Sequence, residues 1–108
     1  MSQDFLGEFE QMVLLSIMRL DNHAYGLAIR NELAEVAGRK PSSGSLYTTL
    51  DRMEKKGFVE SFAGESTQER GGRPRRYVRV TADGKALLAR SRSSLLALWD
   101  GIERALDR

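Results

Sequence analysis

Five arginines lie within ten residues of one another near the middle of the chain: Arg70, Arg73, Arg75, Arg76 and Arg79. Two glycines and a proline interrupt the first four of them. A guanidinium group binds phosphate through a planar fork of donors and enters narrow minor grooves, and glycine lets a loop follow a groove closely. The pattern indicates a polyanionic partner, with a loop kept in solution by its charge as the alternative.

A segment with helical spacing precedes the arginines and carries a second group of polar side chains. Leu46, Leu50 and Met53 recur at i, i+4 and i+7, which predicts the buried stripe of a helix over residues 43–56. The side opposite this stripe is expected to carry hydroxyls and one arginine: Ser45, Thr48, Thr49 and Arg52. Small hydroxyls permit close approach to DNA, and arginine can pair bidentately with guanine. An ordinary solvent-facing helix remains the alternative for this segment taken alone.

The order of the predicted elements explains how the two groups would be brought together. Helices are expected over residues 6–20, 25–37, 43–56 and 81–106, and strands over residues 58–62 and 75–81 with a polar turn at 64–72 between them. Asp21-Asn22-His23 is a turn that ends the first helix. Three helices followed by a hairpin form the winged-helix arrangement, in which the second helix of the helix-turn-helix enters the major groove. The predicted fold is therefore mainly α with a small β-hairpin: a winged helix-turn-helix DNA-binding domain at 1–81 and a C-terminal dimerisation helix at 82–108, together one compact domain.

Composition limits the classes of function. The formal net charge is +2, but residues 39–79 carry ten Lys and Arg against five Asp and Glu, a net charge of +5, which favours a polyanion as partner. With no cysteine and only His23, the chain has no thiol nucleophile, no metal-ligand cluster and no paired acid/base groups. We therefore expect no enzyme activity, no metal and no cofactor. No apolar run reaches the roughly 18–20 residues of a membrane span, and the N-terminus lacks a signal peptide, so a cytoplasmic location without membrane contact is expected.

Several short motifs, taken in order, resemble the PadR-type transcriptional regulators. They are residues 6–10 with 13–15, Tyr25-Gly26-Leu27-Ala28-Ile29, Gly44-Ser45-Leu46-Tyr47 followed by Leu50, Met53, Glu54 and Gly57, Arg70-Gly71-Gly72-Arg73, Arg76-Tyr77 and residues 80–84. Each motif is weak alone, but the ordered set, from about residue 6 to 88, is specific. Many members have proline directly after the tyrosine, where this chain has Thr48. The change should not harm the helix, and it adds a hydroxyl on the DNA side.

The resemblance implies a homodimeric regulator, usually a repressor, in which Tyr47 and its neighbours contact DNA. It also implies that the last helix forms the dimer contact, often with the first helix. The candidate contacts to double-stranded DNA are Ser43, Ser45, Tyr47, Thr48, Thr49, Arg52, Lys56, Arg70, Arg73, Arg75 and Arg76. The alternative function is a winged-helix module that binds another protein without DNA, because a fold does not fix a function. Such a module would not need five arginines in the wing.

An apolar seam runs along the predicted last helix and is too long for one small domain to cover. Its members are Leu88, Leu95, Leu98, Trp99, Ile102 and Leu106. A homodimer would bury this seam and place two reading helices about 34 Å apart, as paired half-sites require. In some short PadR-type regulators an aromatic residue of the last helix lines a pocket for planar compounds. Trp99 is therefore either a dimer-core residue or a stacking surface for a small aromatic effector.

Overall fold

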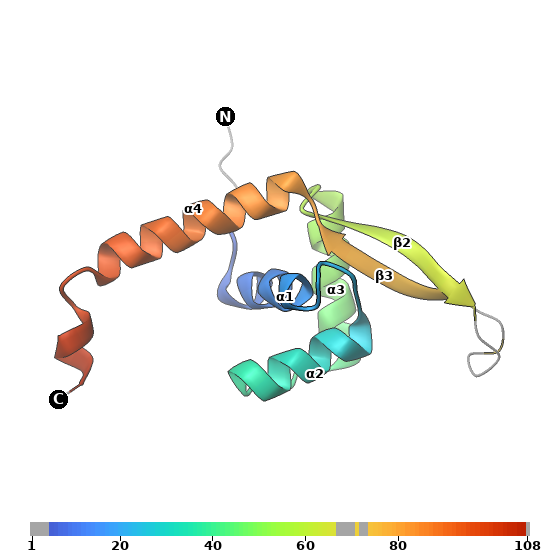
Figure 1. The fold of residues 1–108 in the computed structure, drawn as a ribbon, viewed down its shortest axis with the longest axis horizontal. Coiled ribbons are helices and arrows are strands. Elements are labelled where there is room, and N and C mark those ends of the chain that lie inside the picture. Colours follow the sequence, from blue (N-terminus) through green and yellow to red (C-terminus); the bar gives the residue numbers. More distant parts are fainter. Residues whose placement is uncertain (1–4, 67–70, 72–73, 108) are drawn as a thin grey trace.

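The computed structural model describes residues 5–66, 71 and 74–107 of the chain. Its elements are α1 (Glu8–Arg19), β1 (Ala24–Tyr25), α2 (Gly26–Ala37), α3 (Ser43–Lys55), β2 (Val59–Ser66), β3 (Pro74–Val80), α4 (Ala82–Trp99) and the 3-10 helix η2 (Glu103–Leu106). Three helices pack together, the hairpin of β2 and β3 extends to one side, and α4 leads away on the other (Figure 1). The predicted order of helices and strands is confirmed.

Each helix begins and ends where its local chemistry requires. The Ser42 hydroxyl accepts a hydrogen bond from the Ser45 amide at the start of α3, and the Thr81 hydroxyl accepts one from the Gly84 amide at the start of α4. These side chains satisfy amide donors that have no partner within the helix. Helix α2 ends at Gly38, whose φ of 66° is the left-handed conformation that glycine adopts without strain.

The sheet has three antiparallel strands in the order β1-β3-β2. Val59 faces Val80 and Phe62 faces Tyr77 across β2 and β3, and the register shifts between Ala63 and Ser66. Strand β1 was not expected from the sequence, since two residues are too short to show alternation. Strand β2 was expected to end at residue 62 but continues to Ser66, because Ala63 and Ser66 still pair with β3.

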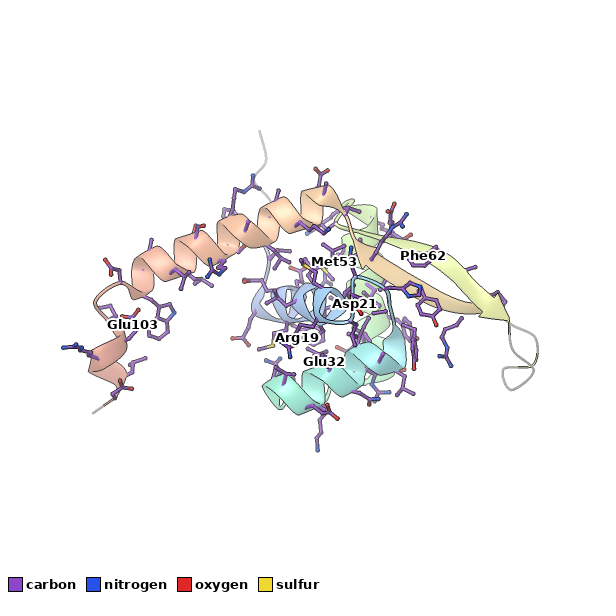
Figure 2. The ribbon with its side chains drawn as sticks, viewed as in Figure 1. Arg19, Asp21, Glu32, Met53, Phe62 and Glu103 are labelled. Atoms are coloured by element: carbon purple, nitrogen blue, oxygen red, sulfur yellow. The ribbon has the colours of Figure 1, made fainter. Side chains whose placement is uncertain are left out.

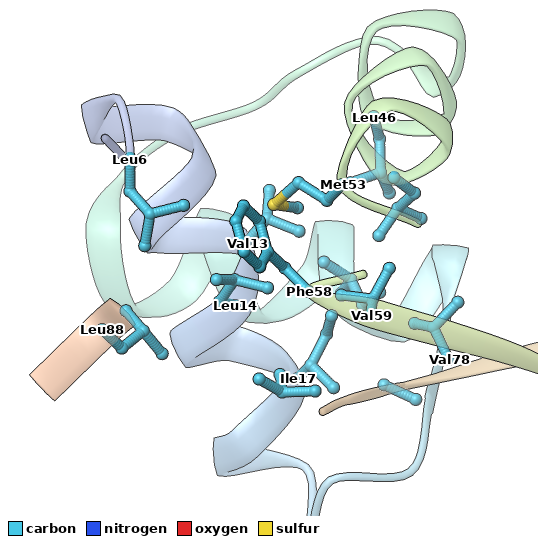
Figure 3. Packing of buried hydrophobic residues seen from close by; sticks show 14 of the residues in the cluster. Leu6, Val13, Leu14, Ile17, Leu46, Met53, Phe58, Val59, Val78 and Leu88 are labelled. Carbon is cyan, nitrogen blue, oxygen red and sulfur yellow. The ribbon is translucent and has the colours of Figure 1, made fainter. Parts of the chain in front are cut away.

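The core lies between the three helices and the inner face of the sheet (Figure 3). Val13, Leu14 and Ile17 of α1 are fully buried, and Val78 and Val80 cover them from the sheet. Contributions from the remaining elements include Ile29, Leu33, Leu46, Leu50, Met53, Phe58, Val59 and Leu87. Outside the core, the Arg19 Nε lies 2.7 Å from a Glu32 carboxylate oxygen and links α1 to α2 (Figure 2). Among the described residues, no helix is long and apolar enough to cross a membrane.

Helix α4 differs from its prediction in two ways. Leu88 was expected in the dimer seam, but only 8% of it is exposed and it packs in the core of its own chain. Its position in the second turn of α4, directly after Leu87, places it against the rest of the domain (Figure 3). The helix was also expected to reach Leu106, but it ends at Trp99, because Gly101 takes a φ of 80° that no α-helix contains. Both remaining seam residues therefore lie beyond α4: Ile102 directly precedes η2, and Leu106 is its last residue.

Candidate nucleic-acid interface

Helix α3 is fixed by its buried side and presents its other side to solvent. Leu46, Leu50 and Met53 are at most 1% exposed. Lysine and glycine end the helix: Lys56 is the cap residue, Gly57 has a φ of 83°, and the Phe58 amide returns to the Met53 carbonyl at 2.9 Å. The residues left exposed on this helix and its cap include Ser43, Ser45, Tyr47, Thr48, Arg52 and Lys56. Six of the predicted contact residues therefore lie at the surface.

Thr49 does not belong to this outer side. It is only 4% exposed, although it was expected beside Thr48 on the side opposite the leucines. Thr49 follows Leu46 by three positions and precedes Met53 by four, and residues so spaced share one face of a helix. The buried stripe is wider than the i, i+4, i+7 pattern suggested, so the inclusion of Thr49 among the DNA contacts was wrong.

Tyr47 is held against the first turn of α2. A Cβ atom added to Gly26 would lie 2.8 Å from Cζ of Tyr47 and closer still to its hydroxyl oxygen, so only glycine leaves room for the ring. The Arg76 guanidinium lies over the ring, with its Cζ 5.9 Å from the ring centroid. The Tyr47 ring therefore connects α2, α3 and the hairpin, and it remains 39% exposed.

Two adjacent arginines of β3 have different surroundings. The Arg75 Cζ lies 3.9 Å above the centroid of the Tyr25 ring, a cation–π geometry, and its Nε is buried without a hydrogen-bond partner. No described carboxylate pairs with Arg75. Arg76 points to the inner side and its Nη2 lies 3.1 Å from Asp51 and 2.9 Å from Glu54 of α3. Both arginines were expected to be free for DNA, and only Arg75 lacks a carboxylate partner.

Two further arginines also have carboxylate partners. The Arg52 Nε lies 3.2 Å from Oε2 of Glu10, whose other oxygen accepts the Gly7 amide at 2.8 Å. The expected base-reading side chain of α3 is thus tied to the start of α1, although half of it stays exposed. Arg79 pairs with Glu60, its direct neighbour across the hairpin. Arg70 and Arg73 lie outside the described residues.

The outer side of the sheet carries an aromatic stack that was not predicted. The rings of His23, Phe62 and Tyr77 are nearly parallel, with 4.2 Å between the His23 and Tyr77 centroids. Tyr25 meets Tyr77 edge to face at 5.6 Å. His23 reaches this stack from the turn before β1, so it serves packing, and the described residues contain no group of three acidic, His or Cys side chains that could hold a metal. Phe62 meets Tyr77 through the register of β2 and β3, whereas Tyr25 reaches Tyr77 only through the short strand β1, which the sequence did not predict.

Beyond Leu88, the second half of α4 leaves its apolar side chains uncovered. Its exposed members, with those of the following segment, are Leu95, Leu96, Leu98, Trp99, Ile102 and Leu106. On α1, Leu15 and Met18 are also exposed, by 49% and 39%. Five of the six residues predicted for a dimer seam are therefore uncovered in the single chain.

The geometry defines a class of protein: a helix-turn-helix core with a β-hairpin wing beside the second helix of the motif, which is a winged helix. The model of the transcriptional regulator PadR-like family matches residues 14–90. The chain therefore belongs to the PadR-like family, whose members are DNA-binding transcriptional regulators and not enzymes. The resemblance seen in the sequence motifs is confirmed.

The chain is similar to several known proteins. An uncharacterized protein of Lysinibacillus sphaericus is 28% identical over 106 residues, which span 94% of this chain and 86% of that protein. The crystal structure of a PadR family transcriptional regulator from Eggerthella lenta is 29% identical, with a TM-score of 0.70 over 92% of this chain and 86% of the other. A PadR-like transcriptional regulator from Bacillus cereus, 24% identical, shares the fold with a TM-score of 0.74 over 93% and 92% of the two chains.

Proposed function

We propose that this chain is a homodimeric repressor that reads operator DNA with α3 and contacts phosphates with its wing, the hairpin of β2 and β3. One observation carries the proposal: the exposed Tyr47 of α3 packs against Gly26 and lies under Arg76 of the wing, which supports a single DNA-binding surface made by the exposed side of α3 and the wing. Family membership supports DNA as the partner over a protein. The domain division at residues 81 and 82 is part of the proposal.

The side chains proposed to meet DNA are those that α3 and its cap residue leave exposed, together with the partly buried Arg75. Hydroxyls near the start of α3 allow close approach to base edges, and Arg75 and Lys56 suit phosphates. The set consists of Ser43, Ser45, Tyr47, Thr48, Arg52, Lys56 and Arg75. Arg70 and Arg73 join it on the sequence alone.

The experiment begins with retention of genomic fragments, including the region upstream of the protein's own coding sequence, because the fold does not specify the operator sequence. Binding of a retained fragment and of a random duplex is then measured by fluorescence anisotropy. Tyr47→Ala should weaken binding to the fragment more than to the random duplex, since base contacts specify and phosphate contacts only position. Equal losses on both duplexes would remove Tyr47 from the reading surface, and no retention of any duplex at low salt would refute the proposed function.

The homodimer rests on the uncovered apolar side of α4. Burial of one such side chain stabilises by roughly 1.5–3 kcal/mol, so several of them, with Leu15 and Met18 of α1, are enough to drive association. Leu98→Glu should shift the mass measured by light scattering from dimer to monomer. Leu27→Glu is the matched control, because Leu27 is also exposed but lies on α2. A dimer that survives Leu98→Glu, or dissociates equally in the control, would contradict this interface.

Trp99 lies within the proposed interface, either as a core residue or as a stacking surface for a small aromatic effector. As the only tryptophan it reports directly on its surroundings. Flat aromatic compounds are titrated while its fluorescence is followed, and saturable quenching that also releases DNA would establish an effector. No quenching across a broad panel would leave Trp99 as a packing residue. Repression and a cytoplasmic location stay predictions, the first tested by transcription of a reporter with and without the protein.

A further inference from the structure

Helix α3 carries two carboxylates on a side where a DNA-binding helix is expected to avoid negative charge. Asp51 and Glu54 are 61% and 40% exposed at their side chains, so burial does not explain them. Neither pairs with the neighbouring Arg52, which binds Glu10 instead. Both carboxylates meet Arg76, which comes from the wing 22 residues or more further along the chain.

The Arg76 cluster, defined as Arg76, Asp51, Glu54 and Ser61, connects α3 to both strands of the wing. The Arg76 Nη2 donates to Glu54 at 2.9 Å, and its Nε donates to the Ser61 hydroxyl at 3.0 Å. The same hydroxyl donates to Glu54 at 2.6 Å, and Asp51 lies 3.1 Å from Nη2. Two of the arginine's three nitrogens are therefore engaged, and two negative charges offset its single positive charge.

The neighbouring Arg75 shows what a wing arginine does without such partners. It projects from the opposite side of β3, its guanidinium lies over the Tyr25 ring, and no described carboxylate neutralises it. Of these two consecutive arginines, Arg76 is therefore paired with two carboxylates, whereas Arg75 has no described carboxylate partner. The alternation of β3 turns the two arginines to opposite faces, and α3 supplies the carboxylates that only Arg76 meets.

We propose that Asp51 and Glu54 are specificity-determining residues that act through Arg76. They hold its guanidinium on the inner side of the wing, which fixes the wing against α3 and keeps one positive charge per subunit away from the phosphates of non-operator DNA. Non-specific affinity depends on the number of phosphates that cations neutralise, so withholding a cation lowers it. The inference rests on the proposed DNA-binding function and adds a role for residues that do not touch DNA themselves.

The test uses the full chain and a random-sequence 30-base-pair duplex, with affinity measured between about 50 and 200 mM salt. Asp51→Ala/Glu54→Ala should bind this duplex more tightly and steepen the plot of log affinity against log salt by about 0.9 per subunit, the value of one added phosphate contact. Over that fourfold salt range one contact corresponds to about a threefold change in affinity. Arg76→Ala alone should leave the slope unchanged, whereas Arg75→Ala should flatten it by about 0.9.

A double-mutant cycle separates release of Arg76 from simple loss of negative charge. In an Arg76→Ala background the double alanine variant has no arginine to release, so its slope should match that of Arg76→Ala. An equal gain in both backgrounds would mean that the carboxylates act only by repelling phosphates, and would overturn the proposal. A flatter slope for Arg76→Ala alone would also overturn it, since Arg76 would then already contact phosphate.

The outcomes distinguish this inference from the function on which it rests. Binding by the unmodified protein is measured first, and its absence on every duplex refutes DNA binding and the specificity role together. Unmodified binding with identical slopes in all four members of the cycle refutes only the role of the Arg76 cluster. The side chains substituted in the cycle, Asp51, Glu54 and Arg76, are at least one-third exposed, so each member of the cycle should fold, and thermal unfolding by circular dichroism verifies this for the cycle and for Arg75→Ala.

Discussion

Asn22 joins the turn after α1 to the end of the wing, and its substitution gives the sharpest test of how the wing is anchored. Its Oδ1 accepts the Val80 amide at 2.8 Å and its Nδ2 donates to the Val80 carbonyl at 3.2 Å, across 58 residues of sequence. Its φ of 56° is left-handed, a conformation that asparagine tolerates better than alanine. The Asn22 side chain therefore makes the two hydrogen bonds to Val80 that the backbone of a neighbouring strand would make.

Asn22→Ala should lower the free energy of unfolding by about 2–4 kcal/mol. Two partly buried hydrogen bonds contribute about 0.5–1.5 kcal/mol each. The left-handed backbone adds about 1 kcal/mol for a residue with a Cβ. A domain of this size has a total stability of about 5–15 kcal/mol, so the loss is readily measured.

Two control variants separate these contributions. Asn22→Gly loses both hydrogen bonds but relieves the backbone, so it should be about 1 kcal/mol more stable than Asn22→Ala. Asn22→Asp keeps the acceptor for the Val80 amide but places a carboxylate oxygen against the Val80 carbonyl, so it too should be less stable than the unmodified protein.

The assay is urea unfolding followed by circular dichroism at one fixed protein concentration, because the proposed dimerisation would make stability depend on concentration. If Asn22→Ala and Asn22→Gly both stay within about 0.5 kcal/mol of the unmodified protein, the turn does not anchor β3 and the reasoning fails.

Three further substitutions test individual positions. Gly26→Ala should displace the Tyr47 ring while stability stays within about 1 kcal/mol, so duplex binding measured by anisotropy should change and an unchanged curve would contradict the role of Tyr47. Thr49→Val should leave duplex binding unchanged, and a tenfold loss without unfolding would return Thr49 to the DNA surface. Gly84→Ala places a Cβ against a backbone carbonyl and should cost about 1–3 kcal/mol in thermal unfolding, whereas Gly44→Ala, with open space around it, should cost nothing.

Local signals in the sequence were enough to predict the order of the helices and the wing. Serine or threonine before an apolar stripe marks a helix start, and Gly38 and Gly57 mark helix ends, because both effects act within one turn. The main error in a helix came from Gly101. The apolar spacing continues past it to Ile102, but the positive φ of that glycine ends α4 at Trp99.

The candidate site was less predictable than the fold, because its state depends on partners far away in the chain. The exposed hydroxyls of α3 follow from the helix period alone. The pairing of Arg52 with Glu10 joins residues 42 apart, and that of Arg76 with Glu54 joins residues 22 apart. No local pattern indicates such pairs, so the prediction from the sequence treated both arginines as available to DNA.

This pairing changes what the charge of the middle segment means. Residues 39–79 have a net charge of +5, but the cations of α3, its cap residue and the described wing that lack a described carboxylate partner are Lys55, Lys56 and Arg75. If each neutralises one phosphate, the salt slope of one subunit is only about −2.7, before Arg70 and Arg73 are counted. Under the proposed function, a DNA-binding domain with few unpaired cations on its described residues would draw much of its affinity from base contacts or from a second subunit. Two subunits joined through α4 would double the slope while each keeps its Arg76 withheld, so the proposed dimer and the proposed role of the Arg76 cluster would act toward the same result. Affinity would then depend on two correctly spaced half-sites more than on any single stretch of DNA.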